Sequence, residues 1–271
     1  MLTPIYLNGR WFDQPVGLPL NDPGVTAGAI VVETIRTRPT PGGRELFEPD
    51  RHWPRLDAGL AYLGLDRFPG EASPRELCDE LLRRLPPGPS VAVVLLVTPG
   101  PTVVCHARPL PDYSPLHAGG VELQVSDVRQ GVSLPRAFKH RSRLHWWKAA
   151  HQAGPAMAWL PDDDGVLTET AVGNVIGVRG RTLVHAPAGR VVPGVTAAIV
   201  SELAASIGWE CVEEPTTEQS LGDCDEWWLT STGCCVAPVS RIGDRLFPQR
   251  ARYERLVAEW ADRFGDFREW A

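Results

Sequence analysis

Lysine is almost absent from this sequence. Of its 27 basic side chains, only Lys139 and Lys148 are not arginine, and both lie in the stretch FKHRSRLHWWKAAH, residues 138–151. A lysine amine can lose its proton and attack a carbonyl carbon, whereas an arginine guanidinium stays charged at any working pH. A chain that takes its positive charge from arginine can therefore keep lysine where a nucleophile is needed. Drift in an arginine-rich genome explains the same pattern, so this observation alone leaves both explanations open.

Long apolar runs and excess positive charge are also missing. No window approaches the roughly 18 apolar residues that a membrane-spanning helix needs. The first residues, MLTPIYLNGRWF, have neither a basic leader nor an apolar stretch, so we expect no signal peptide. The net charge of −6 argues against a nucleic acid or an anionic membrane as partner. We therefore expect a cytoplasmic protein that acts on small molecules.

The six cysteines lack the paired spacing of a zinc site. Two of them, Cys234 and Cys235, are adjacent and could hardly both bind one zinc ion. We expect reduced thiols, as in a cytosolic protein, and no metal site.

The order of strand and helix patterns predicts an α+β protein of two domains. Residues 111–120, PDYSPLHAGG, are rich in proline and glycine, have no periodicity, and are the best linker candidate. The prediction is a small N-terminal α/β domain at 1–112, a linker at 113–119 and a larger C-terminal domain at 120–271. Strands are expected within 5–12, 28–38, 90–98, 102–110, 121–129, 225–231 and 237–242, and helices within 52–65, 73–85, 142–155, 194–208 and 248–265.

Four stretches carry groups that could bind charged parts of a ligand. GVTAA at 194–198 opens a helix, whose first N–H groups and the Thr196 hydroxyl could bind an anion. LTSTG at 229–233 could bind phosphate through hydroxyls and amides. Arg55 could hold a phosphate by two hydrogen bonds, and Glu169, if buried among its apolar neighbours, needs a cationic partner. Each feature, taken alone, also fits an ordinary solvated residue or helix start.

Together these groups are an amine, a carboxylate, an arginine and two phosphate-binding loops, which is the set that pyridoxal phosphate requires. A lysine binds the aldehyde carbon of this cofactor as a Schiff base. A carboxylate keeps the ring nitrogen protonated, so that the ring can accept electrons, and the remaining groups hold the phosphate.

The order of the motifs resembles that of the class IV, or fold-type IV, pyridoxal-phosphate enzymes, which include branched-chain and D-amino-acid aminotransferases and aminodeoxychorismate lyases. The resemblance covers nearly the whole chain. IYLNGRWF is similar to the family's opening hairpin, GAIVVETIRT to GDGxFETIR, HWPRL to HxxRL, FKHRSRL to the lyase-type KHLNRL, LTETAVGNVIGV to VTExxxxNxF, PGVTAAIV to GITR, and DEWWLTSTGCCVAPVSRIGD to DEVFxTSTxxxxxPVxxIDG.

The resemblance implies a role for each matched residue. Lys139 would be the Schiff-base lysine, and Glu169 would pair with the ring nitrogen of the cofactor. The residues implied to bind the phosphate are Arg55, Val195, Thr196, Ser231 and Thr232. Lys148 would then be structural. The implied fold is like that of D-amino-acid aminotransferases, with a β-barrel-like core in the C-terminal domain, the cofactor between the domains, and a homodimer as the assembly.

The sequence departs from the family pattern mainly at positions that would face the substrate. The Asp-Gly of the second motif is Ala29-Ile30 and its aromatic residue is Val32. The arginine that binds a substrate carboxylate in the D-amino-acid type is Pro99. Two further departures are Ala197 in place of the arginine of GITR, and Ser142 in place of the asparagine of the lysine segment.

Three functions are compatible with these motifs. We expect an aminotransferase that moves an amino group between an amino acid or amine and a keto acid through an aldimine at Lys139. His106, Arg108 and Arg141 are candidates for a replacement carboxylate site. KHRSRL, and Thr34 at a position where lyases can carry a threonine, favour a 4-amino-4-deoxychorismate lyase that releases pyruvate and 4-aminobenzoate. A cofactor-binding homologue without turnover is the third alternative.

Overall fold

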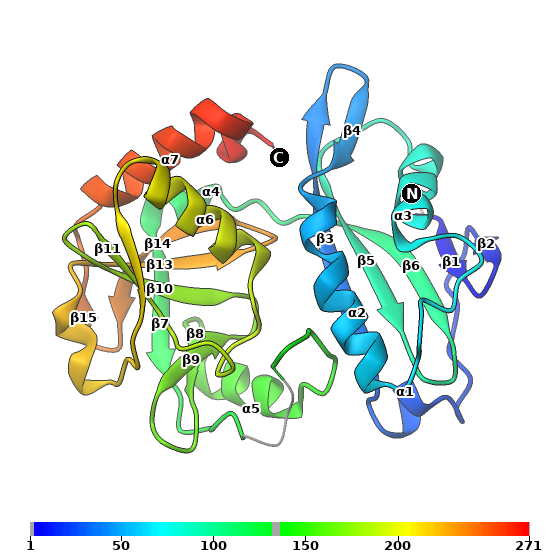
Figure 1. Ribbon diagram of the computed structural model, residues 1–271, viewed down its shortest axis with the longest axis horizontal. Coiled ribbons are helices and arrows are strands. Elements are labelled where there is room, and N and C mark those ends of the chain that lie inside the picture. The colour runs from blue at the N-terminus through cyan, green and yellow to red at the C-terminus, as the bar shows by residue number, and fades with distance from the viewer. Residues whose placement is uncertain (1–2, 132–135, 271) are drawn as a thin grey trace. The chain divides into compact units, whose positions relative to one another are not determined.

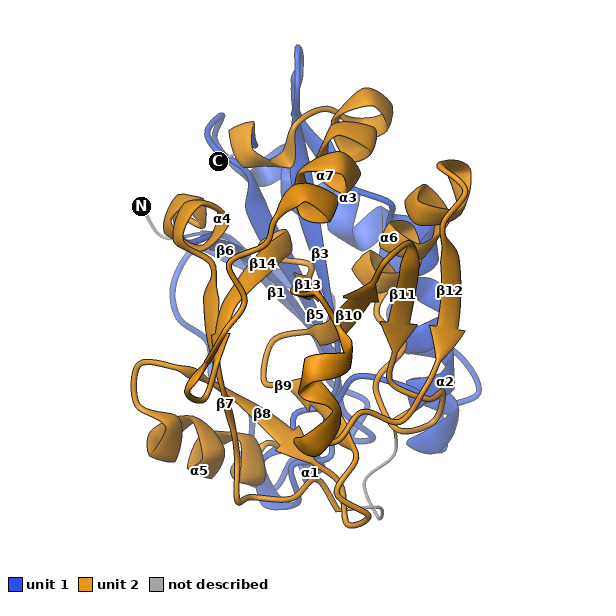
Figure 2. Cartoon of the chain, turned by 90° about the vertical axis from the view of Figure 1, so that its left-hand side faces the viewer, with its two compact units in different colours: residues 1–111, 137–142, 270–271 blue, residues 112–136, 143–269 orange. Residues whose placement is uncertain are grey.

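The computed structural model describes residues 3–131 and 136–270 (Figure 1). The chain forms two compact units (Figure 2). Unit 1 comprises residues 1–111, 137–142 and 270–271, and unit 2 comprises residues 112–136 and 143–269.

Unit 1 is built on a six-stranded antiparallel sheet in the order β2-β1-β6-β5-β3-β4. The predicted hairpin at its edge is confirmed. Asn8 and Gly9 both have positive φ, as a two-residue turn between antiparallel strands requires. The strands are β1 (Ile5–Leu7), β2 (Arg10–Phe12), β3 (Val31–Thr40), β4 (Gly43–Leu46), β5 (Val91–Val97) and β6 (Val103–Pro109).

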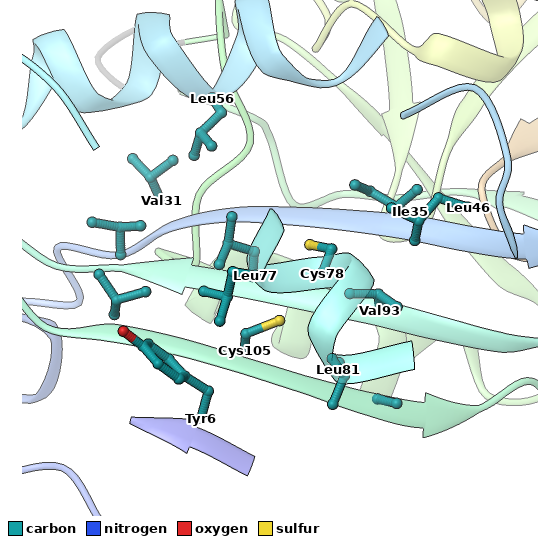
Figure 3. Close-up of a cluster of buried hydrophobic side chains, with 14 of the residues drawn as sticks. Tyr6, Val31, Ile35, Leu46, Leu56, Leu77, Cys78, Leu81, Val93 and Cys105 are labelled. Carbon is teal, nitrogen blue, oxygen red and sulfur yellow. The ribbon is translucent and has the colours of Figure 1, made fainter. Parts of the chain in front are cut away.

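Two helices pack against one face of this sheet, and their apolar side chains form the core shown in Figure 3. Within it, Val31 and Ile35 of β3 meet Leu56 and Leu77 from the two helices, and all four are at most 3% exposed. The second helix begins with a capping box, in which Ser73 and Glu76 exchange hydrogen bonds. The helices of unit 1 are α1 (Pro23–Thr26), the 3₁₀ turn η1 (Pro49–Arg51), α2 (Trp53–Tyr62) and α3 (Pro74–Arg84).

Residues 137–142 come back to unit 1 and lie antiparallel to the start of β3. The Val32 N–H donates to the Lys139 carbonyl and the Arg141 N–H to the Ile30 carbonyl, both at 2.9 Å, so that Val31 lies opposite His140. This segment, with Lys139, counts with compact unit 1 because its backbone bonds to β3. The predicted domain bounds, which put Lys139 in the C-terminal part, stay a prediction. The predicted linker at 113–119 contains helix α4 (Ser114–Gly119) and belongs to unit 2.

Unit 2 contains the predicted β-barrel. In its nine-stranded sheet, β10, β13, β14, β7, β8 and β9 pair in sequence, and β9 also pairs with β10, which closes a six-stranded ring. The strands are β7 (Val121–Val125), β8 (Met157–Pro161), β9 (Leu167–Thr170), β10 (Asn174–Arg179), β11 (Thr182–His185), β12 (Glu210–Glu213), β13 (Glu226–Ser231), β14 (Cys235–Ile242) and β15 (Arg245–Leu246).

The helices of unit 2 lie outside this ring, and α6 packs against both β13 and the long terminal helix. They are α4 (Ser114–Gly119), α5 (Leu144–Ala153), α6 (Val195–Ser206), α7 (Ala251–Phe264) and the 3₁₀ turns η2 (Gln219–Asp223) and η3 (Phe267–Glu269). Every helix among the described residues is too short or too polar to cross a bilayer.

The contact of α2 with the start of β3 depends on Gly59. A Cβ atom at this position would lie 2.6 Å from Val31 Cγ1 and 3.2 Å from Phe138 Cδ2, both in the core. We expect Gly59→Val to lower the free energy of unfolding by about 2–3 kcal/mol, because it overpacks the contact that holds residues 137–142. Chemical denaturation measures this loss. Gly17→Val, which meets no atom within 4 Å, is the control, and an equal loss in both variants would contradict the packing argument.

Candidate active site

A buried ion pair anchors the candidate site in unit 1. Glu33 of β3 is 1% exposed and accepts hydrogen bonds from Arg55 Nε and Nη2, each at 2.7 Å, and from His52 Nδ1 at 2.9 Å. His52 is the residue before α2 and Arg55 lies one helical turn later, so the helix presents both side chains on the same side. The guanidinium plane of Arg55 is thereby fixed by two parallel hydrogen bonds.

Burial by itself would raise the pKa of Glu33. The positive charge of Arg55 and the hydrogen bonds from Arg55 and His52 outweigh it and lower this pKa to about 2. Burial also lowers the pKa of His52, and this effect exceeds the rise caused by the Glu33 charge. The charges of Arg55 and Lys139 lower the pKa of His52 further. At neutral pH, Glu33 is therefore ionised and His52 is neutral, with its Nδ1–H donating to the carboxylate.

The sequence pointed to Arg55 as a phosphate ligand but missed Glu33 and His52. Both left a signal in the sequence. Glu33 is an acidic residue inside the apolar strand run VVETI, and His52 stands three residues before Arg55, the spacing that places two side chains together on a helix. The structure shows that Glu33, His52 and Arg55 form one hydrogen-bonded cluster.

The Lys139 side chain points away from the hydrophobic core of unit 1. Phe138 is 3% exposed and belongs to the core cluster of unit 1, and His140 lies opposite Val31 of the same cluster. Because side chains alternate along an extended segment, Lys139 and Arg141 point to the other side.

Three more of the predicted substrate residues lie on that other face. Val94 of β5 lies opposite Thr34 of β3 and also opposite His106 of β6. Arg108 lies opposite Ala92 and, two residues after His106, points to the same side of β6 as His106 does. Thr34, His106 and Arg108 alternate with Val31, Ile35, Val93 and Cys105, which face the core in Figure 3. Unit 1 therefore gathers Lys139 and the four proposed substrate residues on the sheet face away from α2 and α3.

Glu169 is the predicted carboxylate of unit 2, and the structure buries it to 7% exposure on β9. Its Oε1 accepts from Gln130 Nε2 at 3.1 Å and its Oε2 from the Val192 N–H at 3.3 Å. Both donors are neutral, and they hold the carboxylate in one orientation. A buried carboxylate held in this way could take a cationic N–H group as a further partner.

The predicted phosphate residues of unit 2 lie at the ends of two elements. Val195 and Thr196 are the first two residues of α6, where N–H groups have no partner within a helix, and Thr196 is 7% exposed. Ser231 ends β13, and its Oγ accepts from the Cys234 N–H at 3.2 Å. Thr232 follows in the turn to β14. These groups could hold a phosphate dianion.

Asn174 connects these elements. It lies opposite Glu169 of β9 on one side and Thr230 of β13 on the other, and its Nδ2 donates to the Val192 carbonyl at 3.0 Å. The segment before α6 approaches so closely that a Cβ on Gly194 would lie 2.0 Å from Asn174 Oδ1. The carboxylate, the start of α6 and the end of β13 are therefore brought together by one residue, through its backbone and its amide.

Comparison with known proteins shows the family to which this chain belongs. Residues 30–242 match the family model described as class IV amino-transferase. The chain belongs to the class IV aminotransferase family. A curated protein of Methanocaldococcus jannaschii, named "Putative branched-chain-amino-acid aminotransferase", is 29% identical over 286 residues, which cover 97% of this chain and 96% of that protein.

Solved structures agree with the class IV assignment at the level of the fold. The branched-chain aminotransferase of the thermophilic archaeon Thermoproteus uzoniensis, solved with norvaline, has a TM-score of 0.85 at 21% identity, and the match covers 98% of this chain and 96% of that one. The 4-amino-4-deoxychorismate lyase of Pseudomonas aeruginosa has a TM-score of 0.79 at 23% identity, over 96% and 99%. The class IV resemblance and the fold predicted from the sequence are confirmed.

The Glu33 carboxylate should make this class IV protein sensitive to acid. Its pKa falls from an ordinary 4.5 to about 2 on folding, so its contribution to stability is present above about pH 4.5 and is lost as the pH falls towards 2. Between pH 6 and pH 3.5 we expect wild type to lose about 1.4 kcal/mol of unfolding free energy from this group. Glu33→Gln should be less stable at pH 6 and should lack this part of the loss.

Denaturant titrations at the two pH values measure this difference. Glu71→Gln, which changes an exposed carboxylate, is the control and should keep the wild-type dependence. An unchanged pH dependence in Glu33→Gln would contradict the ion-pair argument.

Proposed function

We propose that this protein is a pyridoxal-phosphate-dependent aminotransferase that moves an amino group between an amino acid or amine and a 2-oxo acid. Membership of the class IV family supports this function, and so does the name of the M. jannaschii relative. The observation that carries it is the position of Lys139, one of two lysines, which β3 holds on the face that also bears Thr34 and His106.

The residues present fit the cofactor by their chemistry. A phosphate dianion suits the N–H groups of Val195 and Thr196, the hydroxyls of Ser231 and Thr232, and the guanidinium of Arg55. Gly194 supports this assignment, because any side chain there would collide with Asn174 and disturb the first turn of α6. Glu169 would hold a proton at the pyridine nitrogen, a role for which its carboxylate is oriented by Gln130 and Val192.

Pyridoxal phosphate, when bound, supplies an aldehyde that takes up the amino group and a ring that accepts electrons from the substrate carbon. Lys139 would be the residue that bonds to that aldehyde in the resting enzyme. Once the substrate amine has displaced it, its Nζ would take the proton from the substrate α-carbon and return it on the other side of the transfer. Glu33 and His52 would act only on Arg55, by fixing the orientation of its guanidinium.

The name of the curated relative makes branched-chain amino acids the first substrates to test. Thr34, His106, Arg108 and Arg141 would line the substrate side, because they share the face of Lys139. We also propose a homodimer in the cytoplasm, as the resemblance to this family implies.

A lyase is the second candidate, and the position of Thr34 favours it. Its side chain lies on the sheet face of Lys139, within the cross-strand row of Val94 and His106. A lyase would release pyruvate and 4-aminobenzoate from aminodeoxychorismate and would need no oxo acid. We expect amino-group exchange between branched-chain amino acids and 2-oxoglutarate, and no 4-aminobenzoate above background. Chromatographic assays for the two products decide between the functions.

Removal of Lys139 tests the central proposal. We expect the purified wild-type protein, supplied with pyridoxal phosphate, to absorb visible light and to retain the cofactor covalently on Lys139 after borohydride reduction. Lys139→Ala should lose the covalent adduct and lose turnover by at least about 1000-fold, since it removes both nucleophile and base. Absorption spectra and peptide mass mapping measure these changes.

Lys148→Ala is the matched control, because it removes the only other lysine, an exposed residue of α5. It should keep the adduct and the activity of wild type. An adduct that maps to Lys148, or full turnover in Lys139→Ala, would overturn the assignment.

A further inference from the structure

Thr168 and Glu169 are neighbours on β9, and the side chains of both contact the amide of Gln130. Gln130 Nε2 donates to Glu169 Oε1 at 3.1 Å, and the Thr168 hydroxyl lies within donating distance of Gln130 Oε1, at 2.7 Å. Thr168 and Gln130 are at most 4% exposed. In a regular strand, adjacent side chains point to opposite faces, so a shared side-chain partner requires a local irregularity.

A β-bulge in β9 lets both side chains reach Gln130. Over this stretch β8 moves by two residues, from Trp159 to Pro161, while β9 moves by three, from 170 to 167. Thr168 and Glu169 therefore stand together against Leu160. A bulge of this kind redirects the side chains of the strand that carries it. The direction of the Glu169 carboxylate thus depends on the bulge and on the contacts made there.

The backbone of Gln130 is fixed from two sides. Its N–H donates to the Pro161 carbonyl at 2.8 Å, and its carbonyl accepts from Arg136 Nη2 at 2.8 Å. With the backbone held in this way, the buried amide has two orientations between Thr168 and Glu169. They differ by the exchange of its oxygen and its nitrogen.

The hydroxyl of Thr168 decides between these two orientations. An ionised carboxylate only accepts hydrogen bonds, so Gln130 must turn Nε2 towards Glu169 and Oε1 away from it. Oε1 is then buried and needs a donor. Thr168 has one proton, which it can give to Gln130 Oε1 or to the Leu160 carbonyl, also at 2.7 Å. Donation to Oε1 is the choice that satisfies the amide in the orientation that Glu169 requires.

We propose that Thr168 is a positioning residue for Glu169 and acts through the amide of Gln130. This inference rests on the proposed function, in which Glu169 holds a proton at the pyridine nitrogen. With the amide fixed, Glu169 Oε1 accepts from Gln130 Nε2 while Oε2 accepts from the Val192 N–H at 3.3 Å. The carboxylate is then aimed in one direction as an acceptor, which suits a charge-assisted hydrogen bond from a ring N–H.

The test compares two ligands that differ at one ring position. Pyridoxal phosphate and its 1-deaza analogue, in which C–H replaces the ring nitrogen, are titrated into the full-length protein after removal of any bound cofactor. Isothermal titration calorimetry gives the Kd of each. The ratio of the two Kd values reports the contact between Glu169 and the ring nitrogen, because all other contacts are common to both ligands.

Four variants separate the hydroxyl and the amide from the rest of the fold. Thr168→Val and Thr168→Ala both remove the hydroxyl, Thr168→Ser keeps it, and Gln130→Met removes the amide. Gln152→Met, which changes an exposed glutamine of α5, is the control. Thermal melting of each variant checks that it is folded, and the two variants without the hydroxyl replace each other if one is not.

We expect wild type to bind pyridoxal phosphate more tightly than the analogue. This preference should fall about 10-fold in Gln130→Met, as the loss of a hydrogen bond to a charged group predicts, and about 3- to 10-fold in Thr168→Val and Thr168→Ala. Thr168→Ser and Gln152→Met should keep the wild-type preference. A merely structural role of Thr168 would weaken the binding of both ligands alike and leave the ratio of their Kd values unchanged.

Two results would overturn the inference. One is a wild-type ratio in the variants without the hydroxyl, and the other is a ratio in Thr168→Ser as low as in Thr168→Ala. The borohydride adduct on Lys139, measured on the same preparations, reports separately on the proposed function. An adduct together with an unchanged ratio refutes only the role of Thr168, whereas wild type without an adduct refutes the aminotransferase and this inference with it.

Discussion

Two backbone hydrogen bonds between the start of β3 and residues 139–141 decide on which face of the sheet the side chains of Lys139 and Arg141 lie. They pair a loop segment with β3, and in such an extended segment successive side chains point to opposite faces. Phe138 enters the core, while Lys139 and Arg141 face the side that also carries Thr34 and Arg108. A slip of one residue in this pairing would bury the lysine and expose the phenylalanine, so the register is strongly specified.

The Glu33–Arg55 ion pair is buried on the core side of the same sheet. Burying two charges is costly, and the pair is held by three short hydrogen bonds that recover much of the cost. Because the Arg55 side chain is almost fully buried, its guanidinium cannot swing into solvent as a surface arginine would. This arrangement would suit the phosphate contact proposed for Arg55, since little conformational entropy remains to be lost on binding.

In unit 2 the candidate groups are held in place by other contacts. Its candidate groups sit at the ends of strands and at a helix start, and Asn174 joins those ends through the backbone and its amide. Glu169 is oriented by Gln130, which in turn accepts a hydrogen bond from Thr168 on the same strand as Glu169. In both units, groups proposed to meet the cofactor are thus held by neighbours within secondary structure, as pre-organised binding requires.

The sequence by itself determined the periodic elements and the chemical inventory. The Asn8-Gly9 turn, the capping box at Ser73, the helix start at Val195 and the scarcity of lysine all depend on local geometry or composition, which neighbouring residues suffice to specify. The ordered motifs also sufficed to recognise the class IV family, because their spacing is specific in combination.

Only the tertiary structure decided which distant residues meet. The bond of Arg55 to Glu33, the return of Lys139 to the first unit, and the common face of Arg108 and Arg141 join residues far apart in sequence. Local patterns carry no information on such pairings, since they follow from strand register and from the need of buried charges for partners.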